Sequence, residues 1–247
     1  MDQANNAKVA IVTGASRGIG AAVAQRLAQD GFAVAVNYAS SPAQADALVA
    51  SLQAGGARAI AVKADVSDAG EVRRMFEIAE QQLGKVDVLV NNAGVLKTVP
   101  LADTSDALFD QTFGINVRGT FNTLREAAAR LNDGGRIVNF SSTTLALNMP
   151  GYAVYNATKA AVESFTHVFA KELRGRNITV NAVAPGPIAT SLFLDGKTEE
   201  QIQAFAKMPP LQRLGQPDDI AGVVSFLVGP DAGWVNGQIL RANGGVA

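Results

Sequence analysis

The amino-acid sequence predicts an α/β fold in which helices cover both faces of one doubly wound parallel sheet of about seven strands. The first observation is an alternation, because short runs rich in β-branched residues are followed by longer alanine-rich runs along most of the chain. Such βαβα alternation is typical of a parallel sheet with right-handed crossovers. The second observation is that the strand runs are apolar through their middles, as expected for parallel strands covered on both faces.

Seven short runs meet the description of buried strands. In chain order they lie at 8–14, 32–38, 57–66, 86–94, 135–142, 177–185 and 237–240. The fourth of them, VDVLVNNAG, shows the pattern most clearly, since its middle is apolar and its end is small and polar.

Longer runs between these strands predict the helices. They lie at 19–31, 42–56, 68–84, 103–132, 152–174 and 217–228, and the fourth range has room for one or two helices. Gly31 ends the first helix, Pro42 lies near the first turn of the second, and Asp68 is expected to cap the third. Asp218 and Asp219 favour the N-terminal turn of the last helix, where acidic side chains stabilise the helix dipole.

The composition is that of a folded domain with a sizeable core. Hydrophobic residues make up 48% of the chain and charged residues 17%, which argues against disorder. The sequence has no internal repeat, low-complexity tract or linker, and 247 residues are enough for one large α/β domain. We therefore expect a single domain over 1–247, with a substrate lid around 187–210.

Charge and residue counts exclude several classes of function. A formal net charge of −1 gives no field that would attract nucleic acid or an anionic membrane. The chain has no cysteine and a single histidine, His167, which excludes disulfides, thiolate catalysis and a histidine-based metal site. The N-terminus lacks the order of a signal peptide, and no apolar run approaches the ~18 residues of a membrane span. We expect a cytoplasmic protein without a metal.

Small and polar residues follow almost every predicted strand. These strand ends are Thr13 and Gly14, Asn37 and Tyr38, Asp65 and Val66, Asn91 to Gly94, Ser141 and Ser142, and Pro185 and Gly186. Because sheets of this kind bind ligands outside the carboxyl ends of their strands, we expect a ligand site along this edge.

The turn after the first strand, TGASRGIG, is typical of a nucleotide-binding loop. Its glycines have the spacing GxxxGxG instead of the more common GxGxxG. Glycine lets the chain turn sharply and lets a pyrophosphate approach the backbone at a helix N-terminus. A tight turn without a ligand is the alternative. The turn residues expected to contact a dinucleotide are Gly14, Ser16, Arg17, Gly18, Ile19 and Gly20.

The end of the second strand favours NADP(H) over NAD(H). NAD-binding proteins usually place an acidic residue there, about 20 residues after the glycines, to hold the ribose 2′-hydroxyl. This chain has no carboxylate in that stretch, and Asn37, Tyr38, Ser40 and Ser41 line it instead. Arg17 can supply the positive charge that a 2′-phosphate requires. Use of NAD(H) as well stays open.

The segment PGYAVYNATKAAVESF, residues 150–165, contains a possible acid–base pair. On a helix, Tyr155 lies one turn before Lys159, and Tyr152 lies on the same face. Periodicity therefore leaves two candidate tyrosines, and an ordinary amphipathic face is the alternative to both.

Several separated motifs together resemble the short-chain dehydrogenase/reductase family, including its 3-oxoacyl-(acyl carrier protein) reductase-like and carbonyl reductase-like members. They are TGASRGIG (13–20), DV (65–66), NNAG (91–94), FGINVRGTF (113–121), IVNFSS (137–142), YNATK (155–159) and ITVNAVAPGPIAT (178–190). The resemblance implies a Rossmann-type fold and hydride chemistry with NAD(P). It implies a catalytic tetrad at Asn116, Ser142, Tyr155 and Lys159.

The chemistry of the tetrad follows from its residue types. Reduction of a carbonyl requires a proton for the developing alkoxide, and a free phenol with a pKa near ~10 is a weak source of it. A cation one helical turn away favours the phenolate, so we expect Lys159 to lower the pKa of Tyr155. Ser142 can hold the substrate oxygen. The resemblance adds that Lys159 holds the nicotinamide ribose and that Asn116 supports a proton relay.

The resemblance assigns further positions to the cofactor and to assembly. The cofactor positions are Asp65 and Val66 beside the adenine, Asn91, Asn92, Ala93 and Gly94 along the cofactor, and Pro185, Gly186, Ile188 and Thr190 over the nicotinamide. A homotetramer is implied, with the helices at 103–132 and 152–174 in one interface. Trp234 is expected in the core or at a subunit contact. Asn243 stands where many relatives have aspartate.

Apolar side chains dominate the loops expected around the substrate. They are Leu145, Leu147, Met149, Leu192, Phe193, Leu194 and Phe205. This lining favours an uncharged ketone, or a β-keto ester or thioester, so the leading hypothesis is a carbonyl reductase that also works as an alcohol dehydrogenase. A sugar or secondary-alcohol dehydrogenase that also uses NAD is the alternative within this class. A catalytically silent nucleotide-binding regulator is the alternative outside it.

Overall fold

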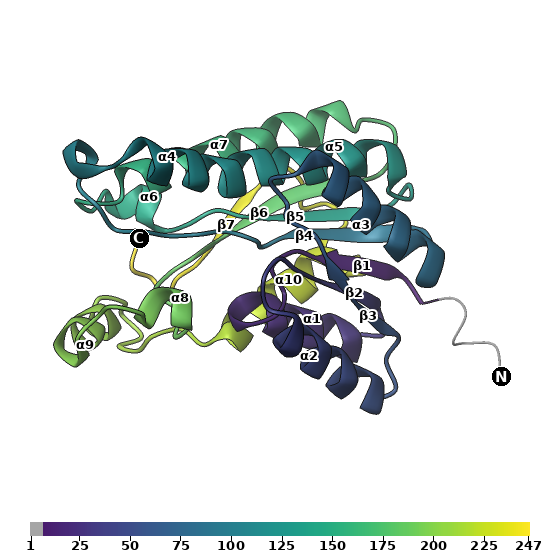
Figure 1. The fold of residues 1–247 in the computed structure, drawn as a ribbon, viewed down its shortest axis with the longest axis horizontal. Coiled ribbons are helices and arrows are strands. Elements are labelled where there is room, and N and C mark those ends of the chain that lie inside the picture. Colours follow the sequence, from purple (N-terminus) through teal and green to yellow (C-terminus); the bar gives the residue numbers. More distant parts are fainter. Residues whose placement is uncertain (1–6) are drawn as a thin grey trace.

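In the computed structural model, which describes residues 7–247, seven parallel strands form one sheet in the order β3-β2-β1-β4-β5-β6-β7 (Figure 1). The predicted doubly wound α/β fold is confirmed. The strands are β1 Val9–Val12, β2 Ala33–Tyr38, β3 Ala59–Lys63, β4 Val86–Asn91, β5 Arg136–Phe140, β6 Thr179–Pro185 and β7 Ile239–Ala242. The strand order reverses between β1 and β4, where sheets of this kind bind ligands. The expectation of no signal peptide rests partly on residues 1–6, which lie outside the described residues.

Helices cover the two faces of the sheet in separate layers. The helices are α1 Gly18–Gln29, α2 Pro42–Ala54, α3 Ala69–Gln82, α4 Asp106–Phe113, α5 Gly119–Arg130, α6 Thr144–Leu147, α7 Ala153–Glu172, α8 Ser191–Leu194, α9 Glu199–Lys207 and α10 Pro217–Val228. Helices α1, α2 and α10 pack on one face, and α3, α5 and α7 pack on the other (Figure 1). Within residues 7–247, no helix combines the length and apolarity that a membrane crossing needs.

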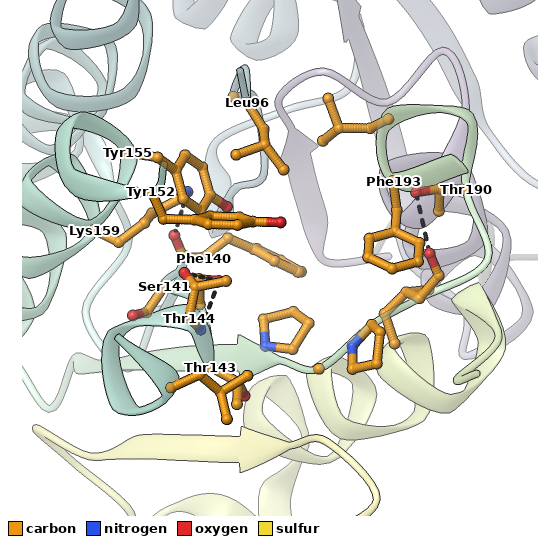
Figure 2. A pocket seen from close by; sticks show the side chains of 18 of the residues that line it. Leu96, Phe140, Ser141, Thr143, Thr144, Tyr152, Tyr155, Lys159, Thr190 and Phe193 are labelled. Carbon is orange, nitrogen blue, oxygen red and sulfur yellow. Dashed lines mark hydrogen bonds between the residues drawn. The ribbon is translucent and has the colours of Figure 1, made fainter. Parts of the chain in front are cut away.

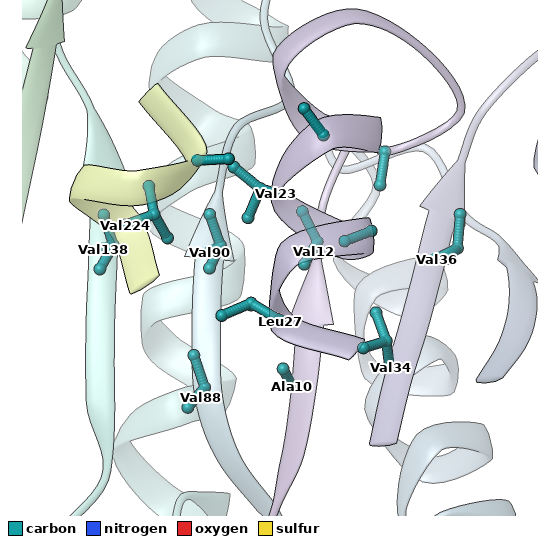
Figure 3. Close-up of a cluster of buried hydrophobic side chains, with 14 of the residues drawn as sticks. Ala10, Val12, Val23, Leu27, Val34, Val36, Val88, Val90, Val138 and Val224 are labelled. Atoms are coloured by element: carbon teal, nitrogen blue, oxygen red, sulfur yellow. The ribbon is translucent and has the colours of Figure 1, made fainter. Parts of the chain in front are cut away.

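Each central strand contributes side chains to both hydrophobic layers. In β1, Ala10 and Val12 face α1 and α10, whereas Val9 and Ile11 face α3 and α5. Figure 3 shows the first layer, in which Leu27 of α1 lies over the strands. Because successive side chains of a strand point to opposite faces, a strand buried on both sides must be apolar throughout. This is why the strand runs show no polar alternation.

The range 103–132 contains two α-helices joined by a π-helical turn, Gly114–Arg118, and a short 3₁₀ turn, Leu101–Asp103, precedes them. Helix α5 then approaches the loop after β3 closely at Gly119, where a Cβ would lie 2.6 Å from Cγ2 of Val66. Single π turns inside helices occur frequently at functional sites. Here the π turn carries Asn116, one of the expected catalytic residues.

Three short helices were not expected from the sequence. Helix α6 follows β5, and α8 and α9 lie in the segment expected to be an irregular lid. Helix α9 begins at a capping box in which the Thr198 hydroxyl accepts from the Gln201 backbone and the Gln201 side chain accepts from the Thr198 backbone. Helices of four to nine residues have too few turns to give a clear apolar period, so local capping is the signal that marks α9.

A chain of buried polar side chains joins the sheet to the helices that carry the candidate site. Thr123 of α5 donates to Asn91 Oδ1 (2.7 Å), and Asn91 Nδ2 donates to Asn139 Oδ1 (2.9 Å). Asn139 Nδ2 in turn donates to the Thr166 hydroxyl of α7 (2.9 Å), which donates to the Val162 carbonyl (2.8 Å). An unpaired buried polar group costs about 1–3 kcal/mol, so this chain favours one placement of α5 and α7 on β4 and β5.

Candidate active site

Two loops meet at the carboxyl ends of β1 and β4 and hold one another in place. The Thr13 hydroxyl accepts from the backbone N–H groups of Asn92 and Ala93, at 3.0 Å each. The Asn92 side chain donates back to the carbonyls of Thr13 (2.8 Å) and Gly14 (3.0 Å). Gly14 has a φ of +60° and touches Ala93 so closely that a Cβ would lie 2.8 Å from its Cα. The glycine turn and the NNAG turn therefore form one rigid floor.

The first turn of α1 is suited to an anion. Arg17 occupies the N-cap in an extended conformation, no side chain caps the helix, and its first turn contains no acidic residue. At Gly20 a Cβ would lie 2.4 Å from Asn92 Nδ2 and 2.6 Å from the Gly14 carbonyl oxygen. The absence of side chains lets the N–H groups at the positive end of the helix face the groove, which is where a pyrophosphate binds in such folds. The residues fit a dinucleotide.

All but two of the expected cofactor residues, Gly20 and Asn91, line one groove or the cavity that adjoins it. The groove is lined by Gly14, Ser16, Arg17, Gly18, Ile19, Asn37, Tyr38, Ser40, Ser41, Asp65, Val66, Asn92, Ala93, Gly94 and Thr190. Pro185, Gly186 and Ile188 line the adjoining cavity, and Ile19, Asn92, Gly94 and Thr190 border both. Gly20 packs beneath the groove. A dinucleotide lying in the groove would reach the cavity with one end.

Two of the polar residues expected beside the cofactor point into the protein instead. Asn37 is buried, its Oδ1 accepts from the Gly14 N–H (3.1 Å), and its Nδ2 donates to the carbonyls of Val62 and Ala64. Asn37 thus braces the glycine turn and has no free amide group for a phosphate. Asn91 lies within the buried polar chain described above. Asn91 is the last residue of β4 and Asn37 the last but one of β2, and burial at these positions explains their roles.

The groove holds few charged side chains beside the end of β2. Arg17 is exposed, and the carboxylate of Asp65 accepts from the backbone N–H (2.8 Å) and hydroxyl (2.7 Å) of Ser67. Among the described residues that line the groove, Arg17 and Asp65 are the only charged ones. Arg17 is therefore the one cation that the described lining of this groove offers to an anionic group.

Helix α7 brings Tyr155 and Lys159 to the cavity one turn apart (Figure 2). The Lys159 ammonium lies 5.6 Å from the centre of the Tyr155 ring and donates to the Phe140 carbonyl (2.8 Å). Ser142 follows β5 and lines the same cavity as Tyr155. Tyr152 lies at the helix entrance with its ring edge-on to Tyr155, 6.4 Å between centres. Three of the four expected catalytic residues thus line one cavity.

The fourth, Asn116, lies behind the cavity wall. Its Oδ1 accepts from the Val95 N–H (2.9 Å), and its Nδ2 donates to the Val95 carbonyl (3.0 Å) and the Thr158 hydroxyl (3.1 Å). A Cβ on Gly94 would lie 3.3 Å from Asn116 Oδ1 and 3.7 Å from Lys159 Nζ. Asn116 therefore ties the loop after β4 to α7, and a Cβ at residue 94 would crowd its side-chain oxygen.

Burial controls the pKa values of the acid–base pair. Burial raises the pKa of Tyr155 to about 12, and the hydrogen bond to Ser142 opposes this only in part. Burial also lowers the pKa of Lys159 to about 8. The expectation that Lys159 lowers the pKa of Tyr155 is not met, because desolvation of the phenolate outweighs a lysine that is itself buried and bonded to a carbonyl. The phenol is protonated at neutral pH and can act as a proton donor.

Most of the remaining cavity lining is apolar. Its apolar lining consists of Ile19, Val95, Leu96, Phe140, Leu147, Met149, Pro185, Pro187, Ile188, Leu192, Phe193, Phe205, Met208 and Val246. Leu145 and Leu194, which were expected there, do not line it, and Phe140, Met208 and Val246 were not expected. Val246 enters from the far end of the sequence, which no local pattern indicates. Lys159 is the single charged side chain among the described residues of the lining.

Helices α8 and α9 close one side of the cavity. Phe193 of α8 and Phe205 of α9 pack edge to face, with 5.1 Å between ring centres. Lys197, between the two helices, places its ammonium 4.5 Å from the centre of the Phe193 ring and donates to the Phe193 carbonyl. In Figure 1 the two helices lie apart from the sheet layers, at the end where the C-terminus also lies.

Comparisons with known proteins agree with this geometry. Residues 14–247 match the protein family described as enoyl-(acyl carrier protein) reductase. The chain is 44% identical to a short-chain type dehydrogenase/reductase of Picea abies, over 96% of this chain and 92% of that protein. It is 44% identical to the NADPH-dependent aldehyde reductase-like protein, chloroplastic, of Arabidopsis thaliana, over 96% and 93%. The crystal structure of a blue fluorescent protein from a metagenomic library in complex with NADPH superposes with a TM-score of 0.93 at 43% identity, covering 99% and 100% of the two chains.

The buried lysine predicts a pH-dependent contribution to stability. The pKa of Lys159 is lower in the folded chain than in the unfolded one, so holding its charge costs roughly 3 kcal/mol below pH 8. This cost falls as the pH rises from about 8 toward 10.5, because the folded chain then carries a neutral amine. In urea unfolding, the stability of the wild-type protein relative to Lys159→Met should increase between pH 8 and 10. Lys63→Met, on an exposed lysine, is the control, and an equal difference at both pH values for Lys159→Met would contradict the account.

Proposed function

This chain belongs to the short-chain dehydrogenase/reductase family and is an NAD(P)-dependent oxidoreductase, and we propose that it reduces an uncharged carbonyl compound with NADPH, reversibly, using Tyr155 as the acid. The observation that carries the proposal is a protonated phenol that shares an apolar cavity with Ser142, next to a dinucleotide groove. An acid poised next to a place for a carbonyl oxygen is what this reduction requires of the protein.

The protein's own groups divide the work of proton transfer. A bound nicotinamide supplies or accepts the hydride. Tyr155 gives its proton to the oxygen that becomes the alcohol, and Ser142 holds that oxygen beside the phenol. Lys159, an ammonium next to the ring, steadies the phenolate that forms. Asn116 acts through the Val95 backbone and Thr158, and so keeps the loop after β4 and α7 in register.

NADP(H) is the proposed cofactor, and use of NAD(H) as a weaker substitute is compatible with the groove. Support comes from the lack of a carboxylate between Asn37 and Ser41 and from the exposed guanidinium of Arg17. The printed names of two similar proteins also mention NADPH, one as a dependence and one as a bound molecule. With Asn37 committed to the glycine turn, Arg17, Ser40 and Ser41 are the residues left to hold the 2′-phosphate.

The apolar lining favours a ketone or aldehyde on a hydrophobic body over a charged sugar acid. A carboxylate or phosphate would lie among Leu96, Phe193 and Phe205 without a cationic partner other than the catalytic lysine. The sugar or secondary-alcohol dehydrogenase therefore stands second. A silent nucleotide-binding regulator is disfavoured, because such a protein has no need to bury Lys159 beside Tyr155 at a cavity.

We further propose that α8 and α9 act as a lid and that the protein is a homotetramer of single-domain subunits. The lid is supported by Leu192, Phe193 and Phe205, which reach the cavity from a segment outside the sheet layers. Phe121 of α5 and Val168 of α7 are about half exposed, on the helices that the family resemblance places in an interface. Trp234 is 99% exposed, which contradicts a place in the core and supports the alternative of a subunit contact.

Replacement of the proposed acid tests the function. Tyr155→Phe should lower kcat for NADPH-dependent ketone reduction by about 10²–10⁴-fold, the usual contribution of a general acid. Binding of NADPH, followed by its fluorescence, should persist. Tyr152→Phe is the matched control, since it removes the neighbouring phenol on the same helix entrance and should keep most of the activity. Ketone reduction retained by Tyr155→Phe would overturn the proposal.

The cofactor preference rests on a single guanidinium. Arg17→Ala should raise KM for NADPH by about tenfold, the order expected for a lost charge-assisted hydrogen bond, and leave KM for NADH unchanged. Lys97→Ala changes an exposed lysine that lines a neighbouring cavity together with Arg17, and it should change neither KM. Equal use of the two cofactors before and after the Arg17 substitution would contradict the preference for NADP(H).

A further inference from the structure

Residues 243–247 follow β7 and form a turn beside the substrate cavity. The turn contains two glycines in the left-handed region, Gly244 with φ +66° and Gly245 with φ +89°, and the Val246 N–H donates back to the Asn243 carbonyl (3.4 Å). Val246 lines the substrate cavity, whereas Asn243 lines a neighbouring one. The C-terminus lies at the end of the molecule where α6 and α8 also lie (Figure 1).

The Asn243 side chain holds this turn by three hydrogen bonds. Its Nδ2 donates to the Ala247 backbone oxygen (2.9 Å) and to the Thr143 hydroxyl (3.2 Å). Its Oδ1 accepts from the Gly245 N–H (2.9 Å). Because the Ala247 oxygen only accepts and the Gly245 N–H only donates, these partners fix which end of the buried amide faces which. A carboxylate at this position could replace the acceptor but neither of the two donors.

Close backbone contacts hold the same turn on two sides. At Gly186, which follows β6, a Cβ would lie 2.8 Å from the Cα of Asn243. On the other side, a Cβ on Gly244 would lie 2.9 Å from the Cβ of Pro209. Pro209 lies two residues after the end of α9, and Met208 before it lines the cavity. The turn is therefore packed between the sheet and the base of the lid.

We propose that Val246 is a specificity-determining residue that limits the size of the ketone or aldehyde, and that Asn243 is the positioning residue that holds it there. The inference rests on the proposed function, since it concerns the substrate of that same cavity. An apolar side chain on a fixed turn occupies space that a larger substituent of the substrate needs. Asn243 lies outside the cavity lining, so it acts on the substrate only through the turn.

The bond to Thr143 connects this size limit with the catalytic residues. Thr143 directly follows Ser142 in the chain, and both line the cavity. The aromatic residues Phe193 and Phe205 belong to the lid and move with it, whereas the turn is bonded to the loop that carries Ser142. Val246 therefore keeps one distance from the proposed catalytic residues whether the lid is open or closed.

The first test compares kcat/KM for NADPH-dependent reduction of methyl ketones whose second substituent grows from ethyl to a branched or aromatic group. Val246→Ala should raise kcat/KM for the largest ketone relative to the smallest by about tenfold, the lower value for a methylene in an apolar pocket. Val246→Phe should lower the same ratio by about as much. An unchanged ratio in both variants would overturn the role of Val246.

The second test releases the turn without touching the cavity. Asn243→Asp keeps the size of the side chain but cannot donate to the Ala247 oxygen or to Thr143, so it should shift the ketone ratio in the same direction as Val246→Ala. Hydrogen–deuterium exchange in the peptide that contains residues 245 and 246 should become about tenfold faster, the effect of a lost hydrogen bond.

Asn236→Asp is the matched control for the added charge. Asn236 Oδ1 accepts from the Val180 N–H (2.8 Å), a bond that a carboxylate can keep, and Asn236 lies outside the cavity lining. This variant should change neither the ketone ratio nor the exchange of the turn. If Asn243 had a merely structural role, Asn243→Asp would lower kcat/KM for all ketones in proportion and leave their ratio unchanged, which would contradict the proposal.

The outcomes separate this inference from the function on which it rests. If the ratio stays at the wild-type value in Val246→Ala and in Asn243→Asp while Tyr155→Phe abolishes turnover, the inference is wrong and the function stands. If Tyr155→Phe keeps full activity, the proposed function itself fails, and the exchange measurement still decides whether Asn243 holds the turn. Should Asn243→Asp not fold, the two Val246 variants decide the question.

Discussion

The hydrogen bond between Asn91 and Asn139, across β4 and β5, is the constraint on which the geometry of the candidate site depends. Strands that are apolar on both faces have no polar alternation to fix how they pair or how helices lie on them. The buried pair of asparagines also bonds to Thr123 of α5 and Thr166 of α7. These bonds fix how the helices lie on the strands, because any other placement of the helices leaves buried polar atoms unpaired. They thereby fix α5 and α7, which carry or adjoin every proposed catalytic group.

The same packing that positions the acid–base pair also sets its chemistry at a cost in stability. Lys159 and Tyr155 are held among apolar neighbours, so both favour their neutral forms relative to water. For the phenol this is the form that donates a proton to a carbonyl oxygen. For the lysine it is an energetic burden that a purely structural helix would avoid, which is the usual signature of a functional site.

Much of the fold was predictable from the sequence, because alternation, apolar strands and glycine turns are local features. Helix α10 has the expected limits, and Asp68 caps α3 as expected. The π turn around Asn116, the bracing role of Asn37 and the entry of Val246 into the cavity depend on contacts between distant segments. The expectation that the pKa of Tyr155 is lowered was wrong. The four-residue spacing from Tyr155 to Lys159 indicates a nearby charge, but it does not indicate the burial that outweighs this charge.

The most direct test of the account follows the hydride itself. NADPH carrying deuterium at the transferable position of the nicotinamide would be incubated with the protein and a hydrophobic ketone, and the alcohol analysed by mass spectrometry. The account predicts one deuterium on the carbinol carbon of the product for the wild-type protein, and loss of this labelled product in Tyr155→Phe. Cofactor binding without labelled alcohol from any ketone or aldehyde offered, or equal labelling by Tyr155→Phe, would contradict it.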